Sequence, residues 1–334
     1  MSERLVERKE WQGYAKNNEG EIVTVDLESK TFAAEPEPVD IESMLINRAA
    51  PTIIRPTRRK KPVRSDTRTL VAGDAQIPYQ DDNAVRLFQT AVVETQPDNI
   101  VFVGDMIDLP GQSKYQQHPE FAQTTQSSID TYHNMLAQTR SNAPNANIYV
   151  VHGNHEKRLD DYIRRNAAEV LGLRRANMSH ELAVLTLEYL VRYDDLEVQS
   201  IDGYPNGTLW LEDNLKFVHG TNTQRGGSNA ARYLNTENET TIYGHTHRQE
   251  LAFRTWPMRF GGRVVAAASP GALCLTDGTV PGMKWSMTAQ GEPVKKSENW
   301  QNGILVIDHT PTAHDITPSQ ITERGILIDG KRYA

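Results

Sequence analysis

The chain has 334 residues, enough for one large domain or two ordinary ones, and 38% of them are apolar. Its formal net charge of −7 excludes a general polycation, so any contact with nucleic acid requires a local basic patch. The single cysteine, Cys274, excludes an intramolecular disulfide framework and a thiolate zinc site, and favours a reducing, cytoplasmic setting. No apolar run approaches the ~20 residues that a membrane span needs, so we expect a soluble protein without a membrane partner.

Residues 1–66 differ from the rest of the chain and are predicted to form an N-terminal appendage. Strand-like runs flank a turn signal at residues 17–20, which predicts a small β-hairpin within residues 11–32. An acidic, proline-bearing linker is expected at residues 33–40. The basic run at residues 55–64 is either an arm that tracks phosphates or a charged linker. The linker is favoured because the run has few interleaved aromatic residues.

From residue 67 the pattern becomes an alternation of strands and helices. Three apolar runs are predicted to be buried strands: Thr69–Ala72, Asn99–Val103 and Asn147–Val151. Between them, helical spacing predicts helices over Asp82–Thr95 and Phe121–Arg140. This βαβαβ order predicts right-handed crossovers and a mostly parallel sheet. We therefore assign residues 67–334 to one catalytic domain.

The alternation is interrupted at about residues 158–200 by an insertion that is predicted to form a helical cap near the site. Its two helical segments are expected to begin at Leu159 and to span His180–Tyr193. A hairpin, a short helix and a strand are predicted next, at Thr208–Leu211 with Leu215–Val218, at Asn229–Leu234 and at Thr241–Tyr243. Three later runs are expected to belong to a second sheet: Glu250–Thr255, Arg263–Ala268 and Ile304–Ile307.

Five short polar stretches each follow an apolar, strand-like run. They are Gly73-Asp74-Ala75-Gln76, Gly104-Asp105-Met106-Ile107-Asp108, Gly153-Asn154-His155-Glu156, His219-Gly220 and Gly244-His245-Thr246-His247. Open α/β folds place their chemistry at the carboxyl ends of the strands, so these side chains are expected to converge. Taken singly, each stretch is more often a turn or a cap. Together they predict a dinuclear metal site, because Asp, Asn and His bind hard-to-borderline metal ions.

The residue types suit particular roles at such a site. Two ions about 3.5–4 Å apart need a bridging carboxylate, and Asp105 is placed to supply it. Terminal ligands are expected from a carboxylate, an amide oxygen and imidazoles: Asp74, Asn154, His219, His245 and His247. A hydroxide held between the ions would be the nucleophile. His155 is expected to protonate the leaving group, with Asp108 orienting its imidazole.

This series of motifs resembles the calcineurin-like metallophosphoesterase superfamily over about residues 67–308. Residues 159–163, 225–228 and 300–303 further resemble bacteriophage-encoded members. The resemblance implies a four-layer α/β/β/α sandwich, here with a helical cap and an N-terminal β appendage, that hydrolyses phosphomonoesters or phosphodiesters with two divalent ions. It implies a first metal held by Asp74, Asp105 and His247, and a second held by Asp105, Asn154, His219 and His245.

One position departs from the family pattern. The first motif normally reads Asp-x-His, and Gln76 stands here in place of the histidine. A carboxamide oxygen is a weaker donor than imidazole for zinc or iron. Gln76 therefore ligates through oxygen and favours Mn²⁺ or Mg²⁺, leaves a water in that position, or weakens the first site. The first two outcomes are favoured because every other ligand is intact. Mn²⁺ is the expected ion, with Mg²⁺, Zn²⁺ or Fe as alternatives.

The expected substrate is a phosphodiester in a nucleotide or nucleic acid such as DNA, on the strength of the basic run and the phage resemblance. Arg225 and Arg248, which follow His219 and His247, either bind non-bridging phosphate oxygens or are ordinary surface charge. The alternatives are a phosphomonoesterase, acting on proteins or small molecules, and a non-catalytic binding module. An intact His155 argues against the module. The expected location is the cytoplasm, that of the host if the protein is phage-encoded, and the oligomeric state is left open.

Overall fold

A computed structural model of the chain describes residues 12–16, 22–26, 64–113, 124–223, 228–278, 280, 286–287, 293–294 and 299–334. The chain divides into two compact units, Met1–Thr52 and Ile53–Ala334. In the first unit, β1 (Gln12–Lys16) pairs antiparallel with β2 (Ile22–Asp26), at the place where the sequence predicts a hairpin. The predicted linker and all of the basic run except Arg64 lie outside the described residues.

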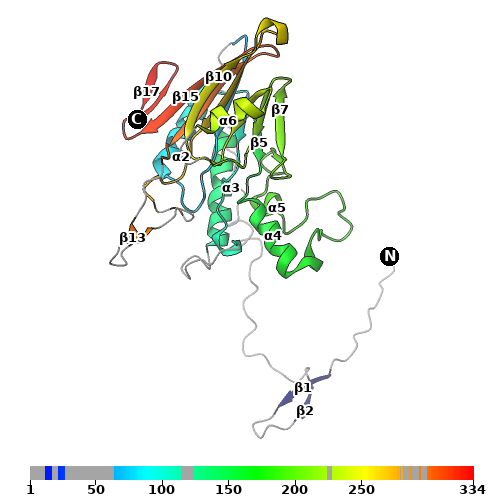
Figure 1. The fold of residues 1–334 in the computed structure, drawn as a ribbon. Helices are drawn as coiled ribbons and strands as arrows, with labels where there is room; N and C mark the ends of the chain where they lie inside the picture. Colours follow the sequence, from blue (N-terminus) through cyan, green and yellow to red (C-terminus); the bar gives the residue numbers. More distant parts are fainter. Residues whose placement is uncertain are drawn as a thin grey trace, which may run out of the picture. The chain divides into compact units, whose positions relative to one another are not determined.

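The second unit contains a large sheet of eight strands in the order β17-β16-β15-β14-β3-β4-β5-β6 (Figure 1). Strands β3 to β6 run parallel, and β14 joins β3 in the antiparallel direction. The strands are β3 (Thr67–Ala72), β4 (Asn99–Phe102), β5 (Asn147–Val151), β6 (Val198–Ile201), β14 (Gly303–His309), β15 (His314–Thr322), β16 (Gly325–Ile328) and β17 (Lys331–Tyr333).

Helices α2 (Asp82–Thr95) and α3 (Thr125–Asn142) cover one face of this sheet. Helix α2 begins where the Asp81 side chain accepts a hydrogen bond from the backbone of Ala84, and it ends at Gln96 in a left-handed conformation. Its apolar side packs on the strands, and burying a side chain such as Phe88 stabilises the fold by about 1.5–3 kcal/mol. The two predicted helices are confirmed, although residues 121–123 lie outside the described residues.

A second sheet of five strands lies against the other face of the first. Its order is β10 (Gln249–Thr255), β11 (Val264–Pro270), β9 (Thr240–Tyr243), β8 (Leu215–Val218) and β7 (Thr208–Glu212). Alternate residues of each strand face opposite sides, so Val71 and Val101 of the first sheet pack with Phe217 and Ile242 of the second.

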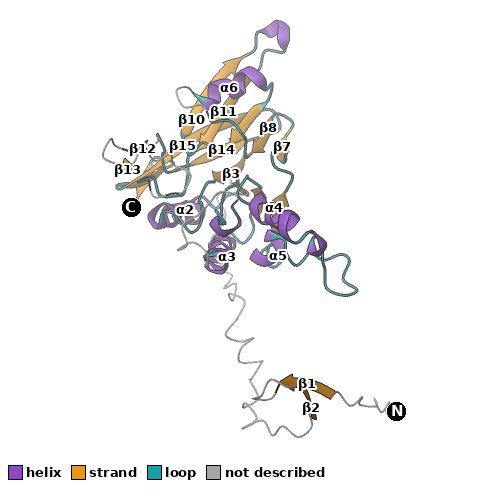
Figure 2. Cartoon of the chain, turned by 60° about the horizontal axis from the view of Figure 1, so that its bottom comes forward, coloured by secondary structure: helices purple, strands orange, loops and turns teal. Residues whose placement is uncertain are grey.

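Helix α6 (Asn229–Thr236) covers the outer face of the second sheet, where Tyr233 stacks on Tyr243 with ring centroids 4.4 Å apart. The layers are therefore helix, sheet, sheet and helix, with α2 and α3 on one outside and α6 on the other (Figure 2). The predicted α/β/β/α sandwich is confirmed.

Several predicted elements need correction. The run Ile304–Ile307 belongs to β14 in the first sheet and not to the second, because Ile307 pairs with Thr69 of β3. The helix expected over His180–Tyr193 shrinks to α5 (Leu187–Val191), which Thr186 caps. The sequence did not indicate β6 or the C-terminal hairpins β15–β17.

The remaining described elements are short, except for α4 of the insertion. Helix α4 spans Lys157–Asn166, and the other elements are η2 (Pro110–Gln112), η4 (Ala168–Val170), η5 (Met258–Phe260) and the pair β12 (Ser286–Met287) with β13 (Pro293–Val294). No helix among the described residues is long and apolar enough to cross a membrane.

Candidate metal centre

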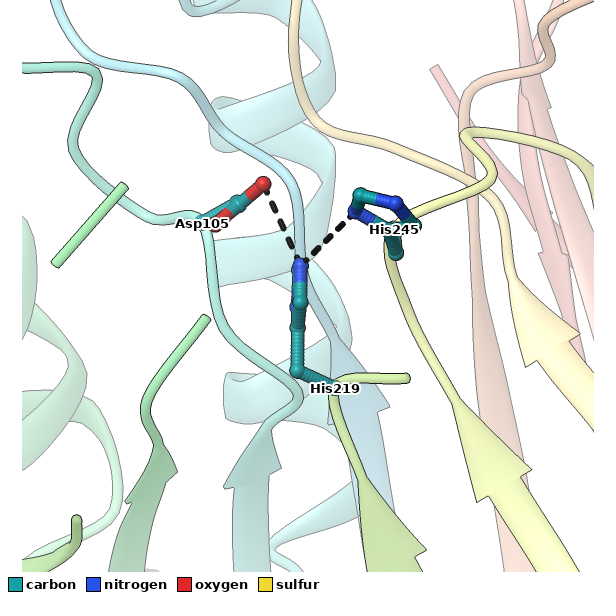
Figure 3. Close-up of side chains that lie close together, drawn as sticks. All are labelled: Asp105, His219 and His245. Atoms are coloured by element: carbon teal, nitrogen blue, oxygen red, sulfur yellow. Dashed lines mark hydrogen bonds and ion pairs between the residues drawn. The ribbon is translucent and has the colours of Figure 1, made fainter. Parts of the chain in front are cut away.

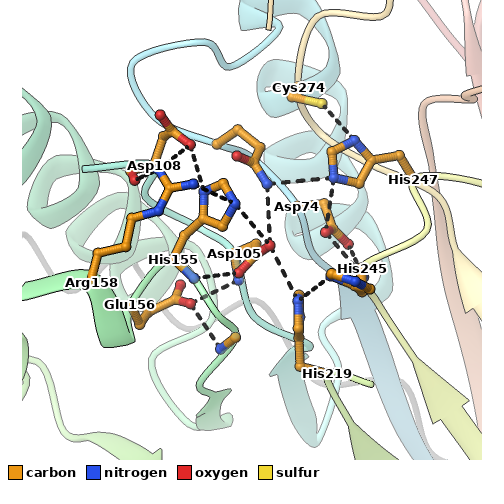
Figure 4. Close-up of polar contacts among 12 residues, drawn as sticks. Asp74, Asp105, Asp108, His155, Glu156, Arg158, His219, His245, His247 and Cys274 are labelled. Atoms are coloured by element: carbon orange, nitrogen blue, oxygen red, sulfur yellow. Dashed lines mark hydrogen bonds and ion pairs between the residues drawn. The ribbon is translucent and has the colours of Figure 1, made fainter. Parts of the chain in front are cut away.

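The ends of five strands bring the predicted ligands together at one edge of the two sheets (Figure 4). Strand β3 leads to Asp74 and Gln76, β4 to Asp105, and β5 to Asn154. In the second sheet, β8 leads directly to His219 and β9 to His245 and His247. Strands β3, β4 and β5 are parallel, as are β8 and β9, so their carboxyl ends meet. The contacts described below place side chains from all five strand ends in one cluster.

The backbone at this edge adopts an unusual conformation. Five of the predicted ligand positions have a positive φ between 50° and 69°: Asp74, Gln76, Asp105, His245 and His247. For residues other than glycine this region costs about 1–3 kcal/mol each, and it recurs at functional sites. Backbone strain at five neighbouring candidate ligands is therefore consistent with a functional site at this edge.

Two glycines allow the strand ends to approach so closely. Gly104 has a φ of 93°, and a Cβ atom there would lie only 2.6 Å from Nδ1 of His219 and 2.7 Å from the carbonyl oxygen of Val151. A Cβ atom on Gly153 would collide with the Asp105 carboxylate. The Gly-Asp and Gly-Asn motifs therefore combine a ligand with the small residue that makes room for it.

Among the described residues, Asp105, His219 and His245 offer potential ligand atoms that all lie within 4.8 Å of one another (Figure 3). Nε2 of His219 lies 3.2 Å from Oδ2 of Asp105 and 3.2 Å from Nδ1 of His245. The other ring nitrogen, Nδ1, is 2.7 Å from the carbonyl oxygen of Val103, so it carries the proton and donates it there. This hydrogen bond turns Nε2 toward the centre, the arrangement that holds ligating histidines in place, and a bound ion would replace the proton that Nε2 carries beside Asp105.

The electrostatics of the cluster favour a positive charge at its centre. Burial opposes protonation of His219, yet the neighbouring Asp105 carboxylate raises its pKa to about 9. Burial would raise the pKa of Asp105, but His155 and His219 hold it well below its usual value. Burial, together with the charge of His219, lowers the pKa of His245 to about 4, so this imidazole is neutral near pH 7. A neutral imidazole and an ionised carboxylate are the forms that bind metal ions.

Two amide oxygens on the loops after β3 and β5 lack a hydrogen-bond donor. Among the described residues, Oδ1 of Asn154 and Oε1 of Gln76 are buried and accept no hydrogen bond. A buried acceptor without a donor costs about 1–3 kcal/mol. An ion bound beside these loops would satisfy such oxygens, that of Gln76 after a half-turn of its amide, because Nε2 now faces Asp105 and His247. The set of one carboxylate, two imidazoles and an amide oxygen therefore fits a divalent ion.

A second group surrounds His247. Its Nε2 atom lies 3.2 Å from Oδ1 of Asp74 and 3.4 Å from Nε2 of Gln76. On the other side of the ring, Nδ1 is 3.6 Å from Sγ of Cys274, and the Trp300 ring packs at a centroid distance of 4.1 Å. The ring is thus held from two sides with Nε2 facing Asp74. This group offers the donors of the first ion of the family pattern, with Gln76 where that pattern has a histidine.

His155 and Asp108 adopt the arrangement expected of a proton donor and its orienting carboxylate. Nδ1 of His155 is 2.5 Å from Oδ1 of Asp108, while Nε2 faces inward and lies 3.7 Å from Oδ2 of Asp105. Arg158, which the sequence did not single out, donates to Oδ1 of Asp108 at 2.9 Å and lies 3.1 Å from Nε2 of His155. Arg158 therefore helps to position both groups.

Glu156 is a second residue whose role the sequence did not reveal. Its buried carboxylate accepts hydrogen bonds from the backbone N–H groups of Asp105, Met106 and Gly153 at 2.9, 2.7 and 2.8 Å. It thus ties the loop after β4 to the loop after β5. The only sign of this role in the sequence is that Glu156 directly follows the Asn-His pair. The spacing of the residues does not show that its carboxylate binds backbone N–H groups.

The two predicted phosphate-binding arginines stay predictions. Arg225 lies outside the described residues, and Arg248 is half-buried directly after His247. Two described histidines that were given no metal role have other partners. His309 lies 2.8 Å from the Thr69 hydroxyl, and His152 contacts Asp202.

A comparison of the sequence with profiles of known protein families shows to which family the chain belongs. The profile described as calcineurin-like phosphoesterase matches residues 67–249, which is more than half of the chain. The chain belongs to the calcineurin-like phosphoesterase family. It is therefore a member of a family of metal-dependent phosphoesterases, and the resemblance stated from its motifs is confirmed.

Individual relatives agree with this assignment. The Gene 54 protein of Mycobacterium phage D29 is 27% identical over 75% of this chain and 93% of its own length. The Gene 54 protein of Mycobacterium phage L5 is 24% identical over 79% of this chain and 97% of its own length. Both support the narrower resemblance to phage-encoded members. Among solved structures, Yfce, a phosphoesterase from E. coli, matches 68% of this chain and 97% of its own at 14% identity, and its TM-score of 0.28 is too low to bear on function.

Proposed function

We propose that this member of the family is a phosphodiesterase that acts on nucleotides or nucleic acid. The observation that carries the proposal is the pair His155 and Asp108, which aims an oriented imidazole at the centre that Asp105 shares. A protein that used the fold only as a scaffold would have no need of such a group. The non-catalytic alternative is therefore the weaker one.

The candidate ligands would hold two divalent ions around a shared Asp105 carboxylate. One ion would be held by Asp105, Asn154, His219 and His245, and the other by Asp74, Asp105, Gln76 and His247. Bound ions would lower the pKa of a water molecule and polarise the phosphoryl oxygens. We propose Mn²⁺, because it accepts a ligand set rich in carboxylate and amide oxygens.

Side chains of the protein would protonate the leaving group. Nε2 of His155 faces the centre, where it accepts from the Arg158 guanidinium at 3.1 Å; once protonated, in place of that contact, it would donate its proton to the departing ester oxygen. Asp108 at Nδ1 keeps the ring in this orientation, as a carboxylate does for a catalytic histidine in other hydrolases. Arg158 fixes Asp108 in turn, so the three side chains act as a unit.

The charge around the centre favours a diester over a monoester. A monoester at neutral pH carries up to two negative charges, and its binding benefits from unpaired cationic side chains. Among the described residues, the cationic side chain in contact with His155 is Arg158, and Asp108 already pairs with it. A diester carries a single negative charge, so its binding needs fewer unpaired cationic side chains.

Parallel turnover measurements test the proposal. Protein loaded with Mn²⁺ is assayed with bis(p-nitrophenyl) phosphate and with p-nitrophenyl phosphate. We expect the diester to have the higher kcat/KM. A preference for the monoester would favour the phosphatase alternative. Absence of turnover with both esters, in protein that binds Mn²⁺, would favour the non-catalytic module.

A further inference from the structure

Helix α4 separates two cavities of different character beside the candidate metal centre. One is an open cleft of about 460 Å³ that includes Asn154 and Tyr204, and we call it the α4 cleft. Its charged lining consists of Lys157, Arg158, Arg164, Arg165 and Asp161. The other is a cavity of about 240 Å³ that is lined by Leu159 and Ile163, among other residues. The cleft is thus basic and the second cavity partly apolar.

The spacing of the residues along α4 explains this division. Positions 157, 158, 161, 164 and 165 follow the i, i+1, i+4, i+7, i+8 pattern that places residues on one side of a helix. Leu159 and Ile163 lie on another side, and Ile163 is buried. One side of α4 is therefore anchored to the domain, while the other presents cationic groups to the cleft.

The cationic groups differ in how far they are already paired. Arg158 is bound to Asp108, and Arg164 is paired with Asp160 at 2.7 Å on the exposed surface. Arg165 uses only Nε, which donates to the carbonyl oxygen of Asp161 at 2.9 Å, and among the described residues no carboxylate pairs with its guanidinium. Exposed pairs such as that of Arg164 exchange partners at little cost. Arg164 and Arg165 are thus available to an incoming anion.

We propose that the α4 cleft binds the backbone of a single-stranded nucleic acid next to the phosphodiester at the metal centre, an inference that rests on the proposed function. The protein as a whole has a net charge of −7, so a strand would be drawn specifically to this basic cleft. The charged side of α4 spans eight residue steps from Lys157 to Arg165, or about 12 Å.

Tyr204 gives the second reason for a single strand. Its ring is half-buried at the junction of the cleft and the centre, and it packs edge-on against His219 with centroids 5.8 Å apart. A basic groove with an aromatic ring on which a base can stack is the usual platform for unpaired nucleotides. In a duplex the bases would be paired and could not reach such a ring.

The test compares two double variants in the full-length, Mn²⁺-loaded protein. R164Q/R165Q removes the available charges of the cleft, and R232Q/R324Q removes two exposed arginines, on α6 and in the β15–β16 turn, as a matched control. Binding of a fluorescein-labelled oligothymidylate is measured by anisotropy over a range of salt concentrations. Turnover of bis(p-nitrophenyl) phosphate is measured in parallel, and thermal unfolding shows whether each variant is folded.

We expect R164Q/R165Q to bind the oligonucleotide about tenfold or more weakly, the loss expected for a charge-assisted contact. The dependence of log K on log salt should become shallower by about 1.4, which is about 0.7 for each lost phosphate contact. The control variant should bind like the parent protein, and small-diester turnover should stay within about twofold of the parent. Should R164Q/R165Q fail to fold, Lys157→Gln serves as a second variant, with a loss of the same sign.

Three results would overturn the proposal: unchanged oligonucleotide binding in R164Q/R165Q, equal losses in the cleft and control variants, or tighter binding of a duplex of the same length. These results are distinct from a failure of the proposed function. A protein that binds the oligonucleotide through the cleft but turns over no diester would retain the binding site and contradict only the catalytic assignment.

Discussion

Nε2 of Gln76 lies 3.3 Å from Oδ2 of Asp105 and 3.4 Å from Nε2 of His247, so the amide reaches between two candidate ligands. The oxygen and nitrogen of an amide exchange places by a half-turn of its last torsion. The half-turn would direct Oε1, which accepts no hydrogen bond in its present position, toward the same point. Gln76 is thus placed either to ligate an ion or to donate to Asp105 in its absence.

Gln76→His is the direct probe of this position. An imidazole is the stronger donor for borderline ions, so we expect tighter binding at the first site and a metal-to-protein ratio closer to two. The ratio is measured by metal analysis after dialysis against limiting Mn²⁺ or Zn²⁺. Gln76→Ala is the matched variant with no donor, and it should bind less metal than the parent. An identical metal content in all three proteins would show that position 76 is not a ligand.

His155→Asn tests the proton donor. We expect kcat for a diester to fall by about 10²–10⁴-fold, the usual contribution of general acid catalysis. The loss should be greater for a diester with a poorly departing alcohol than for a nitrophenyl ester, because only the former needs protonation. Metal content should match the parent. An equal loss with both esters would instead indicate a role in binding or folding.

Arg158→Gln tests the positioning of His155 and Asp108. The guanidinium contacts both side chains, so we expect kcat to fall by roughly tenfold, the effect of losing about one charge-assisted contact. Arg158→Lys should not restore activity, because an ammonium group cannot reproduce the fork of donors. The same leaving-group comparison is the readout, and Arg192→Gln, which removes a surface arginine, is the control. Full activity in Arg158→Lys would contradict a geometric role.

Glu156→Gln tests the link between the β4 and β5 loops. The amide nitrogen of glutamine cannot accept from the backbone donors of Asp105, Met106 and Gly153, so at least one buried N–H loses its partner. We expect a loss of about 1–3 kcal/mol in stability and weaker metal binding. Thermal unfolding and metal titration measure the two effects. Glu169→Gln, at an exposed position, should change neither.

The sequence predicts the buried strands well, and it also predicts the candidate ligands at their carboxyl ends. Both can be recognised from residues that are close together in the chain. Runs such as Ile100–Phe102 are apolar throughout, as in a strand buried on both faces, and each leads to a polar motif. Which strand pairs with which is harder to predict from the sequence. Residues 304–307 read as a buried strand, but nothing in the run shows that it pairs with β3 and not with the second sheet.

The residues that the sequence did not reveal depend on tertiary contacts. Glu156 receives donors from two loops about 50 positions apart in the chain, and Arg158 reaches Asp108 across a similar separation. The strands β15–β17 carry exposed polar residues such as Asp315 and Lys331. Their alternation of polar and apolar residues is a weak signal for a strand when the neighbouring strand is not known. Local spacing therefore identifies the ligands, while the groups that orient them emerge only from the fold.

The most direct test of the account is the rate of diester hydrolysis in protein stripped of metal by a chelator and then supplied again with Mn²⁺. We expect activity to be lost on stripping and to recover with Mn²⁺, but not to recover in His245→Asn, which removes an imidazole from the Asp105 cluster. Full activity in the stripped protein, or no activity in protein shown to hold Mn²⁺, would contradict it.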